Sequence, residues 1–315
     1  MKKTGILIEM ENSRVKDTTL GMITLAARSD AECYALVLDG VDDAACEVLA
    51  RYGITTVVDL GLSFDPAIRL NPAVRADAAA QAAKKLQLDV IFGLSSADGK
   101  DLVPRVAALL DAPLVMDCLD VDLENNIART SQYSGKVLAD IQLTGDVVVF
   151  GIRPNAVQPV PAPAQAETLQ MASGSPAAEG CDLVSWDDGE DGSQTSLAEA
   201  DIIIAGGRGL KNKDNFSLIF DCAEKMHAAA GASRVAVDEG WMPYAFQVGQ
   251  TGEKVSPQVY IACGISGSIQ HFAGMKTARM IIAVNKDENA AIMANCDYHV
   301  QGDLFEILPE LIRQL

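Results

Sequence analysis

The sequence has few aromatic residues, few basic residues and no long hydrophobic run. Lys and Arg total 25 against 43 Asp and Glu, which gives a formal net charge of -18. Nucleic acids and anionic membranes require positive charge on a protein that binds them, so neither is expected as a partner. No apolar stretch approaches the roughly 20 residues of a transmembrane helix. We interpret the charge mainly as a source of solubility, with an acidic docking face as the alternative.

The cysteines are scattered, and no CxxC motif or Cys/His pair has the spacing of metal ligands. They are Cys33, Cys46, Cys118, Cys181, Cys222, Cys263 and Cys296. Their odd number, with several in apolar runs, is typical of buried thiols in a reducing compartment. The first residues, MKKTGILIEM, are too short and too acidic for a signal or transit peptide. We therefore expect a cytoplasmic protein with neither a zinc site nor an iron–sulfur cluster.

The first half of the chain alternates short apolar runs with longer helical stretches. Strands are predicted at 5–10, 34–38, 56–60, 90–94 and 113–116. Helices are predicted at 18–29, 43–52, 72–88 and 100–110. This alternation predicts an α/β fold with a mainly parallel sheet covered by helices on both faces. Residues 121–153 alternate more like antiparallel strands, with turns at 133–136 and 143–146.

Two segments have the composition of linkers. Residues 156–166 (AVQPVPAPAQA) are rich in proline and alanine and should be extended. Residues 186–196 (WDDGEDGSQTS) are acidic and lack apolar anchors. Because a new strand is predicted right after the second segment, we place the domain boundary there. The predicted domains are residues 1–190 and residues 191–315.

The second half predicts another α/β unit of the same Rossmann-like kind. Strands are predicted at 200–205, 234–238, 259–263 and 280–285. A helix is expected to begin after Asp214 as its N-cap and to end at Gly231. An amphipathic helix at 304–315 closes the chain.

Glycine-rich turns follow the apolar runs of this second half. Gly206-Gly207-Arg208-Gly209 follows one predicted strand, CGISGS at 263–268 follows another, and QVGQTG at 247–252 forms a third polar turn. Backbone N–H groups at such turns can hold a pyrophosphate. None matches the GxGxxG fingerprint, and a tight strand–helix turn explains any one of them as well. Three in one small domain predict a nucleotide site at the C-terminal ends of the strands.

Few side chains in these turns suit acid–base chemistry. His271 follows the predicted phosphate turn, so ligand contact and a structural role are equally open. Arg234 is either a surface ion pair or a buried cation beside a ligand that becomes anionic. No nucleophile–base pair or metal cluster is visible, and four carboxylates from Asp117 to Glu124 fit the solvent face of a strand. The pattern indicates a protein that holds a redox or nucleotide cofactor.

Short motifs follow one another in a set order over residues 200–315. They are GGRGL at 206–210, GASR at 231–234, QVGQTG at 247–252, GISGSIQH at 264–271, AVNKD at 283–287 and GDLF at 302–305. In order and spacing this set resembles the alpha subunit of electron transfer flavoprotein. The first half resembles the family more loosely, through its strand–helix pattern and the run at 147–154.

The resemblance implies one FAD in the C-terminal domain and a beta subunit that completes the site and packs on domain 1–190. The FAD contacts that it implies are Arg208, Ser233, Arg234, Gln247, Val248, Gly249, Gln250, Thr251, Ser266, Gly267, Ser268, Ile269, Gln270, His271, Asn285, Asp303 and Leu304. The turn at 266–270 would face the pyrophosphate, and Asn285 and Asp303 the adenosine end. Arg234, Thr251 and His271 would surround the isoalloxazine ring, where Arg234 and His271 would stabilise negative charge.

The function implied is electron shuttling between an acyl-CoA dehydrogenase-type flavoenzyme and another redox partner. One alternative is a flavin-bifurcating, NADH-linked member of the same family. A stand-alone, NAD-dependent enzyme would instead need a general acid or base at the site, and only His271 is available. The chain departs from the usual family pattern at 238–244 (DEGWMPY). A carboxylate of Glu239 near the ring would lower the flavin potential, which we state as a hypothesis.

Overall fold

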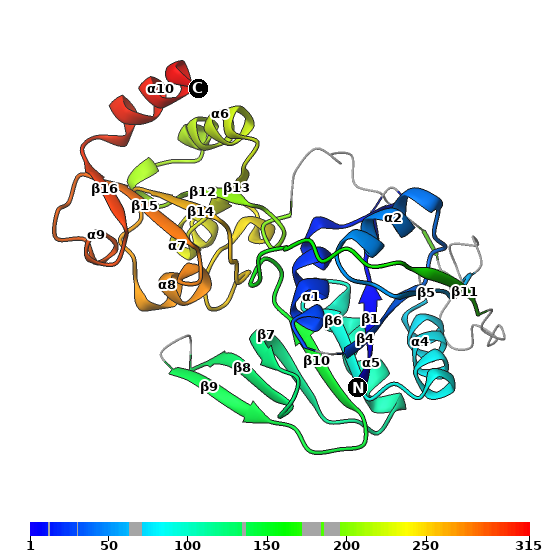
Figure 1. Cartoon of the computed structure of the whole chain (residues 1–315). Helices are drawn as coiled ribbons and strands as arrows, with labels where there is room; N and C mark the ends of the chain where they lie inside the picture. Colours follow the sequence, from blue (N-terminus) through cyan, green and yellow to red (C-terminus); the bar gives the residue numbers. More distant parts are fainter. Residues whose placement is uncertain (12, 30, 63–70, 134–136, 172–183, 186–195) are drawn as a thin grey trace. The chain divides into compact units, whose positions relative to one another are not determined.

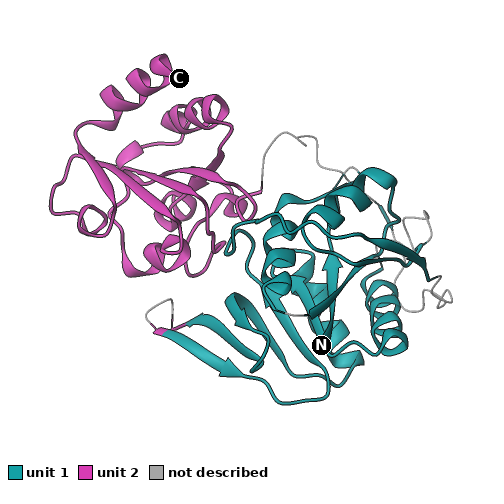
Figure 2. Ribbon diagram, viewed as in Figure 1, with its two compact units in different colours: residues 1–131, 138–187 teal, residues 132–137, 188–315 magenta. Residues whose placement is uncertain are grey.

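The chain folds into two compact units, each built on its own sheet (Figure 2). The computed structural model describes residues 1–11, 13–29, 31–62, 71–133, 137–171, 184–185 and 196–315. Unit 1 comprises residues 1–131 and 138–187, and unit 2 comprises residues 132–137 and 188–315. The predicted boundary at residue 190 and all of the second linker except Ser196 lie outside the described residues, so the boundary stays a prediction.

Unit 1 contains a large, mainly parallel sheet with the order β11-β5-β4-β1-β6-β10-β7-β8-β9 (Figure 1). Its strands are β1 (Lys2–Ile8), β4 (Ala31–Val37), β5 (Thr56–Asp59), β6 (Val90–Leu94), β7 (Leu114–Asp122), β8 (Ile127–Gln132), β9 (Val137–Gln142), β10 (Val148–Ile152) and β11 (Glu167–Gln170). The short strands β2 (Met10–Glu11) and β3 (Arg14–Val15) pair separately. The first linker, 156–166, has no regular structure and leads into β11.

Helices cover both faces of this sheet. They are α1 (Asp17–Ala27), α2 (Asp43–Arg51), α4 (Pro72–Leu86) and α5 (Gly99–Leu109). Leu20 and Ile23 of α1 and Leu49 of α2 pack in one buried cluster with one face of the strands. Val74 of α4 and Leu102 of α5 belong to the cluster on the other face. The predicted alternation of strand and helix is confirmed here, and the central strands β1, β4, β6 and β10 are buried on both faces.

The prediction of antiparallel strands over residues 121–153 is correct only in part. Strand β7 pairs with β8 in antiparallel register. Strand β10, however, runs parallel to both β6 and β7. Its five residues are all buried, and a strand covered on both faces has no polar alternation by which its direction could be recognised. Of the predicted turn at 133–136, residues 134–136 lie outside the described residues.

Unit 2 contains a parallel sheet in the order β13-β12-β14-β15-β16. Its strands are β12 (Ile202–Gly206), β13 (Ala229–Ala232), β14 (Val259–Cys263), β15 (Met280–Asn285) and β16 (Tyr298–Gln301). Its helices are α6 (Ser217–Met226), α7 (Arg234–Asp238), α8 (Ile269–Met275), α9 (Ala291–Ala294) and α10 (Leu304–Gln314), with 3-10 turns η1 (Arg208–Leu210), η2 (Asp214–Phe216) and η3 (Tyr244–Phe246). Met275 and Ile292 pack on one face, and Ile219, Ala236 and Leu308 on the other.

Two predictions for unit 2 are wrong, and both concern the strand β13. The segment predicted as a strand at 234–238 is helix α7, because the Ser233 hydroxyl caps it by accepting a hydrogen bond from the Ala236 N–H. Where one helix was predicted from Asp214 to Gly231, the structure has a 3-10 turn followed by α6. Helix α6 ends before Gly231 because its C-cap residue, His227, has left-handed backbone dihedrals. The strand lies between them, in small residues that carry no strong pattern.

Candidate functional site

The order of the strands in unit 2 brings two of the glycine turns together. From β12 the chain passes to β13 on one side of the sheet, whereas β14 and β15 follow on the other side. The turns after β12 and β14 therefore meet at the point where strand order reverses, which is where open α/β sheets bind ligands. The Gly207 N–H donates to the Cys263 carbonyl at 2.9 Å, and the Gly209 N–H donates to the Gly264 carbonyl at 2.9 Å.

Glycine is required where these two turns touch. A Cβ atom on Gly209 would lie 2.6 Å from the Gly264 Cα, and Gly264 itself has a φ of +63°. Any side chain at either position would force the two backbones apart. The glycines thus serve close backbone packing as well as any contact with a ligand.

A cavity of about 450 Å³ opens at this edge of unit 2. It is lined by these predicted site residues: Arg208, Ser233, Arg234, Gln247, Val248, Gly249, Gln250, Thr251, Ser266, Ser268, Gln270, His271 and Asn285. The turns that are separate in the sequence therefore form one continuous lining. Hydroxyls and amides dominate it, which suits a ligand with many hydrogen-bonding atoms.

The cavity is also lined by residues that were not predicted: Gly209, Val235, Gly264, Ile265, Asp287 and Ala290. Gly209, Gly264 and Asp287 stand inside the quoted motifs, so the motifs carried a signal for them. Val235 was assigned to a strand, and Ala290 carries no chemical signal in the sequence.

Four predicted contacts, Gly267, Ile269, Asp303 and Leu304, do not line this cavity. A Cβ on Gly267 would lie 2.5 Å from the Ile292 nitrogen, so Gly267 allows the turn to approach α9. The Ile269 side chain is 60% exposed. Asp303 caps α10 by accepting a hydrogen bond from the Phe305 N–H, which lowers the pKa of its carboxyl, and Leu304 is buried in the core. Their role as cofactor contacts stays a prediction.

The third turn, residues 247–252, lies directly on helix α8. The Gln250 N–H donates to the Gln270 carbonyl at 2.8 Å, and Gln247 Nε2 donates to Thr251 Oγ1 at 3.0 Å. A Cβ on Gly274 would lie 2.5 Å from the Gly249 nitrogen and Cα. The helix and the turn can touch at backbone distance only because both positions are glycine. None of the quoted sequence motifs includes Gly274.

Arg234 lines the cavity but is not buried. Its side chain is 63% exposed and its Nε donates to Asp238 Oδ2 at 3.2 Å, one turn along α7. The prediction of a buried cation is wrong, and the alternative of a surface ion pair is confirmed. Glu239 is exposed at the end of α7 and is not among the residues that line the cavity. The carboxylate next to the Arg234 guanidinium is therefore that of Asp238.

Asn285 holds the wall of the cavity together. Its Nδ2 donates to the Ile265 carbonyl at 2.9 Å, and its Oδ1 accepts from the Asp287 N–H at 3.1 Å. These bonds join the end of β15 to the turn after β14. The residue therefore has a structural role that its position in the motif did not reveal.

His271 is the titratable group most altered by its surroundings at this site. It is 6% exposed, and its Nε2 lies 3.0 Å from the Tyr260 hydroxyl. Burial lowers the pKa of the imidazole to about 4, partly opposed by the Val248 carbonyl. The ring is therefore neutral at pH 7. Its Nδ1 has no exposed surface and makes no hydrogen bond of ordinary geometry among the described residues, so the effect of the Val248 carbonyl is weak.

This depressed pKa predicts a loss of stability in acid. Because the unfolded chain takes up a proton near pH 6.5 and the folded chain only near pH 4, stability is lost as the pH falls through this window. Between pH 7.5 and pH 4.5, we expect the free energy of unfolding of the wild-type protein to fall by about 3 kcal/mol more than that of a His271→Gln variant. Urea unfolding of both proteins at pH 7.5 and pH 4.5 measures the difference. An equal gap at the two pH values would contradict the prediction.

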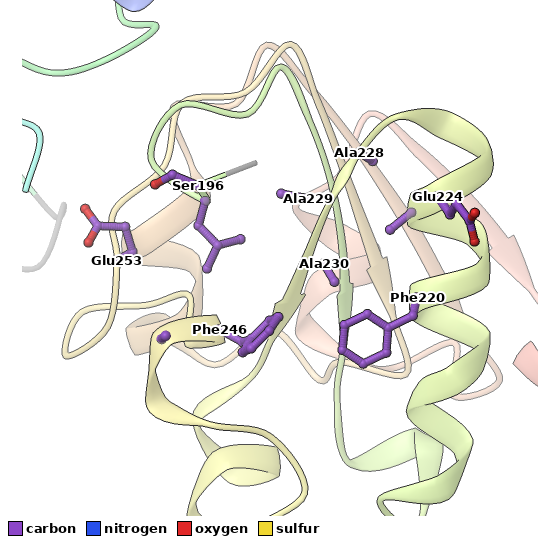
Figure 3. Close-up of a pocket in the computed structure, with 11 residues that line it drawn as sticks. Ser196, Phe220, Glu224, Ala228, Ala229, Ala230, Phe246 and Glu253 are labelled. Atoms are coloured by element: carbon purple, nitrogen blue, oxygen red, sulfur yellow. The ribbon is translucent and has the colours of Figure 1, made fainter. Parts of the chain in front are cut away.

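A second cavity, of about 590 Å³, lies beside α6 and β13 (Figure 3). Phe220 and Phe246 pack edge to face there, with ring centroids 5.8 Å apart and an interplanar angle of 88°. The lining is otherwise largely alanine, with the carboxylates of Glu224 and Glu253, and it includes no lysine or arginine among the described residues. A phosphorylated cofactor needs N–H donors or cations. The cavity at the glycine turns is therefore the better candidate site.

The described residues contain no group of three or more His, Cys, Asp or Glu that could hold a metal ion. Asp117, which we expected on a solvent face, instead accepts hydrogen bonds from the buried Arg153 guanidinium at 2.6 and 2.7 Å. Its left-handed φ of 62° turns the carboxylate away from the strand's regular direction. Across the described parts of the chain, no helix has both the length and the apolar character for a membrane span.

Comparison with known families agrees with the geometry. Residues 4–178 match the model of the electron transfer flavoprotein domain. Residues 196–276 match the model of the electron transfer flavoprotein FAD-binding domain, and this stretch includes most of the cavity lining.

Curated relatives match along almost the whole chain. An electron transfer flavoprotein subunit alpha from Mycobacterium leprae is 36% identical over 99% of this chain and 97% of its own length. The subunit alpha of Bacillus subtilis is 36% identical over the same shares. A mitochondrial subunit alpha of Caenorhabditis elegans is 34% identical over 100% of this chain and 94% of its own.

Proposed function

The chain belongs to the electron transfer flavoprotein alpha-subunit family, and we propose that it acts in a heterodimer with a beta subunit, exchanging electrons with an acyl-CoA dehydrogenase-type flavoenzyme. Its cofactor is FAD, the ligand of the domain that residues 196–276 match. The observation that carries the proposal is the cavity itself, which is rich in hydrogen-bond donors and contains no nucleophile–base pair among its lining residues.

The lining residues fit FAD on three counts. Glycines at 207, 209 and 264 let the two turns pack backbone against backbone, which brings lining residues of both turns to one cavity. Ser266, Ser268 and Gln270 add hydroxyl and amide groups beside that edge. His271 lines the cavity with a buried, neutral imidazole, a group that can form hydrogen bonds with a ligand. The proposed pyrophosphate side is thus the turn at 266–270.

FAD, when bound, supplies a ring that takes up and releases electrons. The chain's own contribution is a set of donors directed at charge that the ring gains on reduction. Arg234 would provide a positive charge, which Asp238 partly neutralises, and Thr251 a hydroxyl. His271 would provide a neutral group, because its pKa of about 4 excludes the imidazolium at pH 7. No residue is needed to move a proton in pure electron transfer, in agreement with the lack of an acid–base pair.

The proposal includes a cytoplasmic location and an N-terminal unit that packs on the beta subunit. In support of the second point, the outer strand β9 is largely exposed, with Leu138 at 55% and Val137 at 49% exposure. Apolar side chains along an exposed sheet edge are typical of a surface that another chain covers.

The test is to co-express the chain with its beta subunit and to count flavins and electrons per purified heterodimer. We expect one FAD, reduction by an acyl-CoA dehydrogenase with its substrate, and none by NADH. Two FAD with reduction by NADH would replace the proposed shuttle by the bifurcating alternative. A colourless, catalytically active chain that needs no partner would contradict the proposal altogether.

A further inference from the structure

The phenol of Tyr244 holds one end of the turn at 247–252. Tyr244 begins the 3-10 turn η3, and its hydroxyl donates a hydrogen bond to the Thr251 carbonyl. The direction of this bond is fixed, because a carbonyl oxygen can only accept. Thr251 lines the cavity, whereas Tyr244 is not among the lining residues. Any influence of the phenol on a ligand therefore passes through the turn.

The glycines of this turn leave it little rigidity of its own. Gly249 has a φ of +152°, and a Cβ on Gly252 would clash with the Gln247 carbonyl oxygen. Both positions therefore require glycine, the residue that loses the most conformational freedom on folding. Contacts with neighbouring elements must offset that loss.

These contacts are unevenly distributed along the turn. Its middle is held on helix α8 by the hydrogen bond from the Gln250 N–H to the Gln270 carbonyl, at 2.8 Å. Thr251, in contrast, has no backbone–backbone hydrogen bond with any described residue. It is held by the Tyr244 phenol at its carbonyl and by Gln247 Nε2 at its hydroxyl. Without the phenol, the Gln247 side chain would hold this end of the turn alone.

The phenol extends from a firm base. In the same 3-10 turn, Phe246 packs edge to face against Phe220 of α6. The Gln247 N–H donates to the Tyr244 carbonyl at 2.9 Å, at the end of η3. Tyr244 is 65% exposed, but its backbone is thus fixed to the core of unit 2.

We propose that Tyr244 is a positioning residue, whose phenol holds the Thr251 end of the turn and so sets where Thr251 stands beside the flavin ring. The inference rests on the proposed function, in which the Thr251 hydroxyl is one of the donors directed at the ring. Such a donor is effective only when it is held within about 0.5 Å of the required position. Tyr244 lies outside the motifs that connect the chain with its family, in the segment 238–244.

The first test measures order in the turn and does not depend on electron transfer. Tyr244→Phe keeps the ring and removes the donor. By hydrogen exchange of the purified heterodimer, we expect the amides of residues 249–253 to exchange roughly threefold faster in this variant. Tyr298→Phe is the matched control, because Tyr298 is 62% exposed and its phenol forms no hydrogen bond with the described residues. Wild-type exchange in Tyr244→Phe, or equal acceleration in both variants, would overturn the inference.

The second test asks whether the phenol acts through Thr251. In Tyr244→Phe we expect roughly threefold weaker FAD binding and a roughly threefold weaker preference for reduced over oxidised flavin. For a one-electron couple the second factor corresponds to about 28 mV. In a Thr251→Val background, which lacks the hydroxyl, the same substitution should leave the potential unchanged. An equal shift in both backgrounds would indicate a merely structural role and would contradict the inference.

The two failures can be told apart. If the heterodimer contains no FAD, the proposed function fails, while hydrogen exchange still reports on the phenol. If FAD is present and Tyr244→Phe alters neither the exchange nor the potential, the inference fails and the proposed function stands.

Discussion

Replacing Arg153 with methionine is expected to destabilise unit 1 by about 3 kcal/mol. Arg153 is 3% exposed, and its guanidinium donates two hydrogen bonds to the Asp117 carboxylate, at 2.6 and 2.7 Å. Without the arginine, the carboxylate loses these partners while its side chain is only 24% exposed. Urea unfolding of the heterodimer, with hydrogen exchange of the β7 and β10 amides, measures the loss and assigns it to unit 1.

The chain offers a matched control for this prediction. Arg129 binds Asp140 with the same two-bond geometry, at 2.8 and 3.0 Å, but both side chains are about half exposed. We expect Arg129→Met to change the free energy of unfolding by less than about 1 kcal/mol, because exposed ion pairs contribute little. Similar losses for the two variants would show that burial is not the deciding factor. Asp117→Asn combined with Arg153→Met should recover part of the loss.

Gly274→Ala should weaken FAD binding at least tenfold and destabilise unit 2 by about 1–3 kcal/mol. Helix propensity alone predicts the opposite sign, a gain of roughly 1 kcal/mol for alanine within α8. The close approach decides, because the new methyl group would lie 2.5 Å from backbone atoms of Gly249. The turn at 247–252 must then move away from α8, taking Gln250 and Thr251 with it. Titration of FAD into the flavin-depleted heterodimer measures the affinity.

Gly302→Ala is the control for this second prediction. There the added methyl group meets only the Ile307 side chain, at 2.9 Å, which can move at low cost. We expect nearly unchanged FAD affinity and stability for this variant. If Gly274→Ala behaved in the same way, or stabilised the protein, the packing of the turn on the helix would not be what shapes the site.

The strands of unit 2 show what periodicity can and cannot predict. The strands predicted at 259–263 and 280–285 are those of the structure, because an apolar run between turns is what a buried parallel strand requires. The segment 234–238 was misassigned, since Val235 and Val237 alternate as they would in a strand. One cap, the Ser233 hydroxyl, is enough to begin a helix there. Local caps of this kind outweigh weak periodicity over five residues.

The residues of the site likewise divide into those that the sequence motifs predict and those that only the folded geometry shows. The motifs identified residues that the structure brings to one cavity, because most of their turns follow strand ends of the same sheet and the turn at 247–252 lies on helix α8 beside them. They gave no indication of Gly274 or Tyr260, which contact the lining residues Gly249 and His271 without lining the cavity themselves. They also suggested burial for Arg234, whose exposure depends on the helix that carries it.

By itself the sequence determined the α/β class, the family and the FAD cofactor, since these depend on local patterns and on short motifs in a set order. Only the tertiary structure decided which turns meet, which charges are buried and that the imidazole of His271 is buried. Those properties depend on groups distant in sequence, such as Asp117 with Arg153 and Gly249 with Gly274. Burial and hydrogen-bond direction arise only when such groups come into contact, and no local pattern records them.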